Sequence, residues 1–152
     1  MNNSEKGYRA EEEFGVELWM RYGVQPIKSE GMEDMGSHWD WKLQGFKYDV
    51  KSKKSMDRKH LWIEFRNVRG RKGWLFGEAD VLAFDRDKYW MLVNRQKLVD
   101  VLAPDMDFET MFEDVSEKVP WRMYRRLNRV DGVVLVPIIK LLETEPTMWW
   151  KR

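Results

Sequence analysis

The chain has 152 residues, a formal net charge of +1 and no cysteine. This length suffices for one domain with a hydrophobic core and is short for two, so we expect a single domain over residues 1–152. Without cysteine, disulfides, thiolate zinc sites and cysteine nucleophiles are excluded. The only histidines are His38 and His60, which disfavours a histidine-based metal site and points any metal site toward carboxylates and hard cations.

The first residues lack the charged-then-apolar pattern of a secretory signal, and no apolar run approaches the ~20 residues that span a bilayer. We therefore expect a cytoplasmic protein without a membrane partner. Its compactness would suit a phage or mobile element, in which case the host cytoplasm is the expected location.

Residues 4–22 have the apolar spacing of a helix. Ala10, Phe14, Leu18 and Tyr22 recur at helical intervals, and Gly23 is placed to end the helix. The following residues 24–37 contain proline and glycine and predict a loop.

Residues 38–54 contain two runs in which apolar and polar side chains alternate, one on each side of Gln44-Gly45. This pattern predicts a β-hairpin with those two residues as its loop. The register then pairs Trp41 with Tyr48 and places Asp40 directly opposite Asp49.

Opposed carboxylates in an antiparallel strand pair lie with their Cβ atoms about 5 Å apart and destabilise the pair unless something compensates. A divalent cation would compensate, so we predict that Asp40 and Asp49 bind Mg²⁺, with Mn²⁺ able to substitute. Lys51 falls on the same strand face, where it can orient a water and neutralise charge on a phosphate under attack. A surface strand with alternating solvated charges is the alternative interpretation.

Asp40, followed nine positions later by Asp49-Val50-Lys51, resembles the D…(D/E)xK signature of the PD-(D/E)xK nuclease superfamily. That family includes restriction endonucleases, Holliday-junction resolvases and phage nucleases. Two departures are that no proline precedes Asp40 and that the second acid is Asp, where Glu is commoner. The resemblance covers the hairpin well and the preceding helix fairly well, and the rest of the chain matches only in the order of its elements.

The resemblance implies an α/β fold with a restriction-endonuclease-like core, in which helices flank a mixed central β-sheet. It also implies Mg²⁺-dependent hydrolysis of DNA phosphodiester bonds to 5′-phosphates. The implied catalytic residues are Asp40, Asp49, Lys51 and Glu11, and the implied metal ligands are Asp40, Asp49, Glu11 and the carbonyl of Val50. Resolvases of this size act as dimers, so the resemblance also implies a homodimer.

Glu11 is the expected third acid because the segment from Gly7 to Phe14 looks like the first helix of resolvase-type members, which carries a glutamate. Glu11 lies three positions before Phe14 and thus on the inward side. The choice between Glu11 and Glu12 stays open, and glutamates in the first turns also favour a helix through its dipole.

Further along the chain, the patterns predict strands at 61–67, 81–84, 89–93 and 132–136. They also predict helices after the N-cap Asn94, at 107–117 and at 121–128. Glu64 is a fourth acid near the metal or an ion-pair partner. We expect the tryptophans at the C-terminus to dock on this domain or on a second subunit.

Basic residues gather between 42 and 72 and again in 121–128. Such clusters suit contacts with a phosphate backbone that do not read sequence. The predicted nucleic-acid-binding residues are Lys53, Lys54, Arg69, Arg71, Lys72, Arg122 and Arg125. A solvated loop, or pairing of the arginines with the acidic 107–117 segment, would explain them equally.

The patterns and the resemblance together predict a metal-dependent deoxyribonuclease with structure-selective or weakly sequence-specific cleavage, since no separate sequence-reading domain is present. The alternative is an inactive nuclease-like domain that serves as a nucleic-acid-binding or assembly module. Only the first requires a carboxylate-dependent metal site.

Overall fold

The computed structural model describes residues 2–31, 36–53, 58–113, 118–125 and 130–152. These residues form a mixed α/β structure with three α-helices and two mixed β-sheets. In this part of the chain, no helix combines the length and the apolar character that crossing a membrane requires.

The predicted first helix is confirmed as α1 (Asn3–Tyr22). Its start is a capping box, in which the Asn2 side chain accepts from the Glu5 amide and the Glu5 side chain accepts from the Asn2 amide. Gly23 ends it with a φ of 67°, a left-handed conformation that favours glycine. Phe14 and Leu18 are fully buried and anchor the helix on the first sheet.

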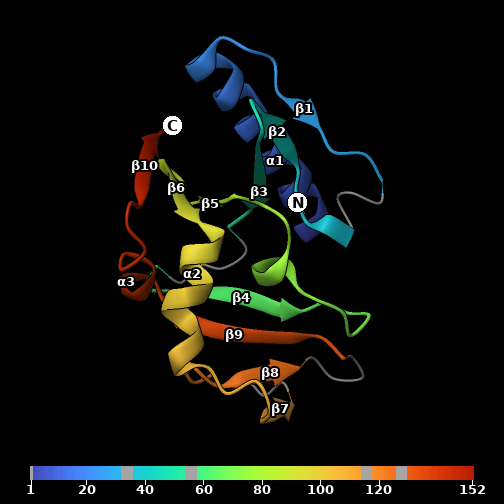
Figure 1. Cartoon of the computed structure of the whole chain (residues 1–152), viewed down its shortest axis with the longest axis vertical. Helices are drawn as coiled ribbons and strands as arrows, with labels where there is room; N and C mark the ends of the chain where they lie inside the picture. Colours follow the sequence, from blue (N-terminus) through green and yellow to red (C-terminus); the bar gives the residue numbers. More distant parts are fainter. Residues whose placement is uncertain (1, 32–35, 54–57, 114–117, 126–129) are drawn as a thin grey trace.

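The first sheet has six strands in the order β1-β2-β3-β5-β6-β10. The strands are β1 (Ile27–Lys28), β2 (Trp41–Leu43), β3 (Phe46–Lys51), β5 (Val81–Asp85), β6 (Tyr89–Asn94) and β10 (Met148–Lys151). β3 and β5 are parallel, and the other neighbours are antiparallel. The apolar strands β5 and β6 lie in the interior of the sheet, as predicted, and α1 lies along one side of it (Figure 1).

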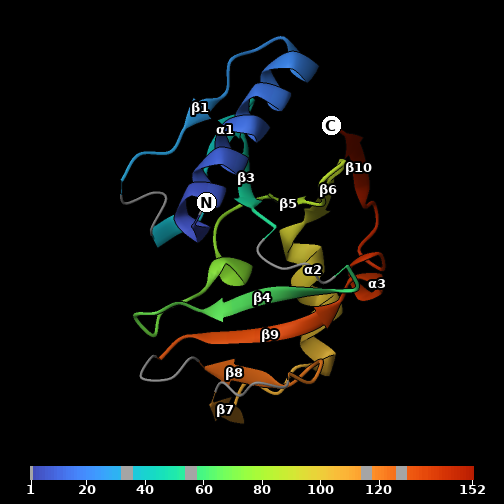
Figure 2. The same ribbon diagram turned by 180° about the vertical axis from the view of Figure 1, so that it is seen from behind.

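The second sheet has four strands in the order β4-β9-β8-β7. They are β4 (His60–Arg66), β7 (Met111–Glu113), β8 (Met123–Arg125) and β9 (Gly132–Pro137). In Figures 1 and 2, β4 and β9 run across the view below the first sheet. The predicted mixed α/β fold is confirmed, but the strands form two mixed sheets where one was predicted, because the strand predicted at 61–67 pairs with β9.

Two hydrophobic cores hold these layers together. One joins α1 to the first sheet through Phe14, Tyr48, Val50 and Trp90. The other packs the opposite face of the first sheet against the second sheet and the helix α2 (Arg95–Leu102). As predicted, Asn94 caps α2 by accepting from the Lys97 amide. The remaining elements are α3 (Ile138–Leu141) and the 3₁₀ turns η2 (Trp74–Phe76) and η3 (Ala103–Asp105).

The predicted hairpin and its register are confirmed. Trp41 pairs with Tyr48, Lys42 with Lys47 and Leu43 with Phe46. Gln44 and Gly45 have φ angles of 50° and 87°. Two positive φ values are what a two-residue turn that matches the twist of its strands requires.

The predicted helices at 107–117 and 121–128 are wrong over their described residues. Asp107 Oδ1 accepts from the amides of Glu109 and Thr110, a local bonding pattern that competes with helix formation. Trp121 has a φ of 69°, which no α-helix accommodates. The segments that follow form β7 and β8 instead, and residues 114–117 and 126–129 lie outside the described structure.

The C-terminal tryptophans dock on this domain as β10, which is one of the two predicted outcomes. Trp150 is buried, and its ring stacks on Phe14 with centroids 5.9 Å apart. Trp149 stays half exposed.

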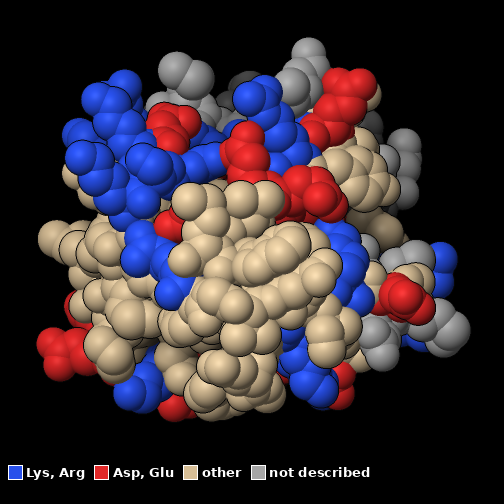
Figure 3. All heavy atoms as spheres, turned by 90° about the horizontal axis from the view of Figure 1, so that it is seen from above, with Lys and Arg blue, Asp and Glu red and all other residues tan. Residues whose placement is uncertain are grey.

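The outer side of α1 remains apolar. Val16, Trp19 and Met20 are 55%, 51% and 78% exposed. Seen from above relative to Figure 1, the molecule presents a broad uncharged surface bordered by basic and acidic side chains (Figure 3). Surfaces of this kind often mark protein contacts.

We expect Gly15→Ala to lower the free energy of unfolding by about 1–3 kcal/mol, because a Cβ there overpacks the interface between α1 and the hairpin. A Cβ at Gly15 would lie 2.3 Å from the Trp41 ring, whose Nε1 donates to the Glu11 carbonyl (2.8 Å). Alanine is the better helix former by about 1 kcal/mol, so the result separates packing from propensity. Urea unfolding measures it.

Gly7→Ala is the matched control in the same helix, since its Cβ meets no atom within 4 Å. It should raise stability by up to about 1 kcal/mol. Equal effects of the two substitutions would contradict the packing of Trp41 against Gly15.

Candidate metal and catalytic site

The hairpin brings Asp40 and Asp49 together, as the sequence predicts. Asp40 directly precedes β2, and its amide donates to the Tyr48 carbonyl (2.7 Å). Its Oδ2 accepts from the Val50 amide (2.6 Å). Both aspartates are only 3% exposed, so two carboxylates are buried side by side at the end of the hairpin.

Asp49 and Lys51 share one face of β3, because side chains two residues apart in a strand point the same way. Lys51 Nζ lies 2.9 Å from Asp49 Oδ1. The second oxygen, Asp49 Oδ2, is buried and has no hydrogen-bond partner among the described residues. A buried carboxylate oxygen without a donor is costly, and either a proton or a cation on this atom would remove that cost.

Burial is the largest single influence on the pKa of both Asp49 and Lys51, but it sets the net direction only for Asp49. Burial raises the pKa of Asp49 above its ordinary value, and interactions with Lys51 and Asp40 offset this only in part. For Lys51, burial lowers the pKa, but the charges of Asp49 and Asp40 outweigh it and the net direction is upward. Lys51 is therefore an ammonium ion near neutral pH.

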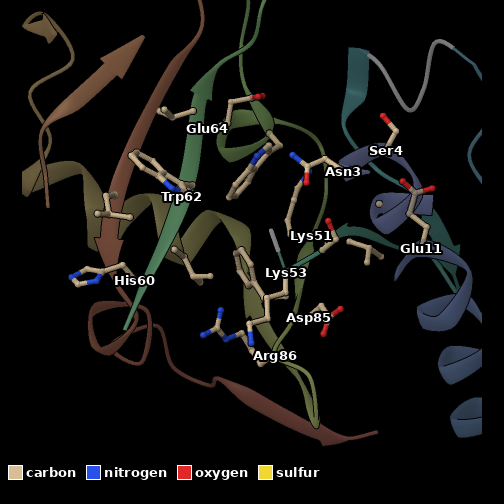
Figure 4. Close-up of a pocket in the computed structure, with 18 of the residues that line it drawn as sticks. Asn3, Ser4, Glu11, Lys51, Lys53, His60, Trp62, Glu64, Asp85 and Arg86 are labelled. Atoms are coloured by element: carbon tan, nitrogen blue, oxygen red, sulfur yellow. The ribbon is translucent and has the colours of Figure 1, made fainter. Parts of the chain in front are cut away.

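A cleft of about 780 Å³ lies beside this pair (Figure 4). One wall is the first turns of α1, another is the end of β3 with Lys51, and the facing wall is one side of the second sheet. Lys51 lines the cleft, whereas Asp40 and Asp49 are buried behind it.

Among the helix glutamates, Glu11 borders the cleft, whereas the Glu12 side chain is 70% exposed. Of the two candidates, only Glu11 therefore borders the cleft, and its role as the third acid stays a prediction. Glu11 Oε2 is engaged by Lys28 Nζ at 3.0 Å. Within the described ranges, no three Asp, Glu or His side chains are grouped so as to hold a metal ion, so the predicted third acid does not form a preassembled centre with the two aspartates.

The two other predicted participants border the same cleft. Val50 borders it while its side chain packs in the α1 core. Glu64 reaches the cleft from β4 (Figure 4), and its charge helps to raise the pKa of Lys51.

The predicted phosphate contacts are spread over separate places. Lys53 lines the cleft and pairs with Asp87. Arg69, Arg71 and Lys72 occupy an exposed turn after β4, which Asn67 closes by accepting from the amides of Arg69 and Arg71. Lys54 lies outside the described residues.

The predicted helical face of arginines does not exist in the described residues. Arg125 lies on β8 and lines the cleft, whereas Arg122 precedes β8 and stacks over Phe112 at 4.5 Å. The two arginines therefore lie in different places, Arg125 at the cleft and Arg122 against Phe112.

Sequence reasoning did not predict the aromatic wall of the cleft. Trp62 on β4 and Tyr124 on β8 line it, and their rings meet edge to face. Alternation places Trp62, Glu64 and Arg66 on one side of their strand, and a tryptophan among charges was the available signal. Tyr124 carried no signal while its segment was interpreted as a helix.

The donor atoms of the two aspartates suit a hard divalent cation. Mg²⁺ binds through one or two carboxylates and completes its octahedral shell with water and substrate phosphates. Asp49 Oδ2 is an open oxygen beside the Asp40 carboxyl, and no nitrogen or sulfur ligand is needed. The pair therefore fits Mg²⁺ or Mn²⁺ without a third protein carboxylate.

In EDTA, we expect the stability of the wild type relative to Asp49→Asn to fall as the pH rises above 3.8. The pKa of Asp49 in the folded protein lies above 3.8, its ordinary value, which applies to the unfolded chain. At a pH between these two pKa values, the folded protein binds more protons than the unfolded chain, so stability decreases as the pH rises. Asparagine does not titrate and serves as the control. Melting temperatures of both proteins between pH 4 and 7 measure this. If the melting temperature of the wild type rose relative to that of Asp49→Asn as the pH increased, the result would contradict the burial cost of the Asp49 carboxylate.

Comparison of the chain with protein-family models, with curated proteins and with solved structures finds no match.

Proposed function

We propose that this protein is a Mg²⁺-dependent nuclease that hydrolyses phosphodiester bonds of DNA. The observation that carries the proposal is the buried pair Asp40 and Asp49 with Lys51 at 2.9 Å from Asp49 and an unpartnered oxygen on Asp49. Burying two carboxylates together costs free energy, and a bound divalent cation would offset that cost.

Asp40 and Asp49 would hold the ion, and the Val50 carbonyl would add a ligand by resemblance to PD-(D/E)xK nucleases. The chemistry that such an ion supplies is charge neutralisation at the phosphate and acidification of water. Lys51 donates hydrogen bonds from its ammonium group, which orients a water toward the phosphorus and stabilises charge on the pentacovalent phosphate. Glu11 would bind the ion through a water molecule once its ion pair with Lys28 is broken.

A restriction-endonuclease-like core is part of the proposal. The leading helix, the acid-bearing hairpin and the mixed sheet support it, and the second sheet is then an addition that builds the far wall of the cleft. The proposal also includes a homodimer, for which the exposed apolar side of α1 is the supporting surface.

The test incubates the protein with plasmid, linear duplex, single-stranded and four-way-junction DNA in Mg²⁺, Mn²⁺ or EDTA. Cleavage in either metal and none in EDTA is expected, and sedimentation of the junction complex reports the dimer. No cleavage of any substrate, with DNA binding retained and unaffected by changes at Asp49, would favour the inactive nucleic-acid-binding module instead.

A further inference from the structure

The wall that the second sheet contributes to the cleft carries aromatic side chains. Trp62 on β4 lines the cleft (Figure 4) and is 36% exposed. Its ring meets Tyr124 edge to face, with centroids 6.2 Å apart and an interplanar angle of 76°. The ring is therefore held in place by a buried neighbour while its own surface stays accessible. Such a ring is a platform on which a flat apolar group can stack.

The same cleft carries more basic than acidic groups. Lys51, Lys53, Arg86, Lys118 and Arg125 line it, against the acids Glu11, Glu64 and Asp85. Two acids and two bases of the lining are paired with residues outside it: Glu11 with Lys28, Asp85 with Arg152, Lys51 with Asp49 and Lys53 with Asp87. The basic groups therefore still outnumber the acidic ones. The surplus of positive charge suits a polyanion.

The size of the cleft and its aromatic lining indicate which form of nucleic acid, duplex or single strand, it suits better. About 780 Å³ lies within the range of pockets that enclose a single small ligand, about 300–1,000 Å³. Asp40 and Asp49 lie behind the lining and are 3% exposed. A duplex keeps its bases stacked inside, whereas a single strand offers one backbone and splayed bases that can stack on an aromatic ring.

We propose that the cleft binds single-stranded DNA, with an unpaired base stacked on Trp62 and the adjoining phosphate directed to Lys51. Arg86 and Lys53, at the end of the cleft near β5, contact the next phosphates. The cleavage of that strand rests on the nuclease function proposed above, but the binding does not. The substrate class is therefore an unpaired DNA segment, either free or at a junction or flap.

The test measures fluorescence anisotropy of a labelled oligonucleotide of about ten residues, single-stranded or as a duplex, in EDTA. The wild type should bind the single strand at least about tenfold more tightly. Trp62→Ala should weaken single-strand binding by about 5- to 150-fold, the range measured for loss of one base–aromatic stack. Trp62→Phe should retain most of the affinity, which excludes misfolding as the cause.

Two further variants sharpen the assignment. Trp149→Ala is the matched control, since Trp149 is also exposed but lies on β10 against Tyr89, and it should leave affinity unchanged. Arg86→Gln should reduce the slope of log affinity against log salt by about 0.7, the value for one phosphate contact in a single strand.

Equal affinity for duplex and single strand, or Trp62→Ala binding as well as wild type, would overturn the proposal. An RNA strand that binds more tightly than DNA of the same sequence would overturn the assignment to DNA. Because these measurements contain no metal, single-strand binding without cleavage under any metal would remove the nuclease function and leave this inference standing.

Discussion

Asp49→Asn should abolish metal-dependent DNA cleavage, down to the level that the wild type shows in EDTA, while the protein stays folded. The substitution replaces the carboxylate that carries the open Oδ2 and accepts from Lys51 with an amide of the same shape. An amide has no charge and offers one oxygen, so the hard cation loses its strongest ligand. Gel assays of cleavage with Mg²⁺ or Mn²⁺ measure the loss.

A thermal shift provides a second readout that does not depend on activity. At a Mn²⁺ concentration 100 times Kd, binding stabilises the wild type by about 2.7 kcal/mol, which raises Tm by about 5–10 °C for a domain of this size. Asp49→Asn should show no such shift. Glu12→Gln is the control, because it also replaces a carboxylate by an amide but at a side chain that is 70% exposed, and it should behave as wild type. A mutant that still cleaves would refute the site.

Lys51→Met should slow cleavage by about 10²- to 10³-fold, the cost of removing one preorganised donor to a transition state. The Lys51 ammonium lies 4.9 Å from the centroid of the Trp74 ring, and methionine keeps a stem of similar length against that ring. Mn²⁺ binding should be retained, because both carboxylates remain and the cation that competes for Asp49 Oδ1 is gone. Single-turnover cleavage and calorimetry with Mn²⁺ measure the two effects separately.

Lys47→Met is the matched control for Lys51. Both lysines lie on the same face of β3, but the Lys47 ammonium lies over Trp39 at 5.6 Å instead of reaching Asp49. Its loss should leave the rate within a few-fold of wild type. Equal losses for both variants would mean that Lys51 acts through general charge alone, and loss of metal binding in Lys51→Met would assign it a structural role.

The hairpin shows what local pattern can predict. The alternation around Gln44-Gly45 predicted the turn, the register and the proximity of Asp40 to Asp49, because a two-residue loop leaves one register that buries the same face of both strands. The helix α1 followed equally from its periodicity and its capping residues, which act within a few positions of the chain.

The second sheet shows where pattern failed. Residues 123–125 have a helix-compatible composition, but Met123 and Tyr124 pair with Val134 and Val133 on β9. Pairing with a strand ten residues away, together with the positive φ of Trp121, outweighed the local preference. The aromatic wall of the cleft was hidden for this reason, since Trp62 and Tyr124 meet only once β4, β9 and β8 are assembled.

The sequence by itself thus determined the acid-bearing hairpin, its lysine and the helix that covers it, because those features depend on period, turn and cap. Only the tertiary structure decided that Glu11 and not Glu12 borders the cleft, that Lys28 holds it, and that a second sheet faces Lys51. These outcomes depend on which distant surfaces bury one another, and nonlocal packing leaves no periodic trace in the chain.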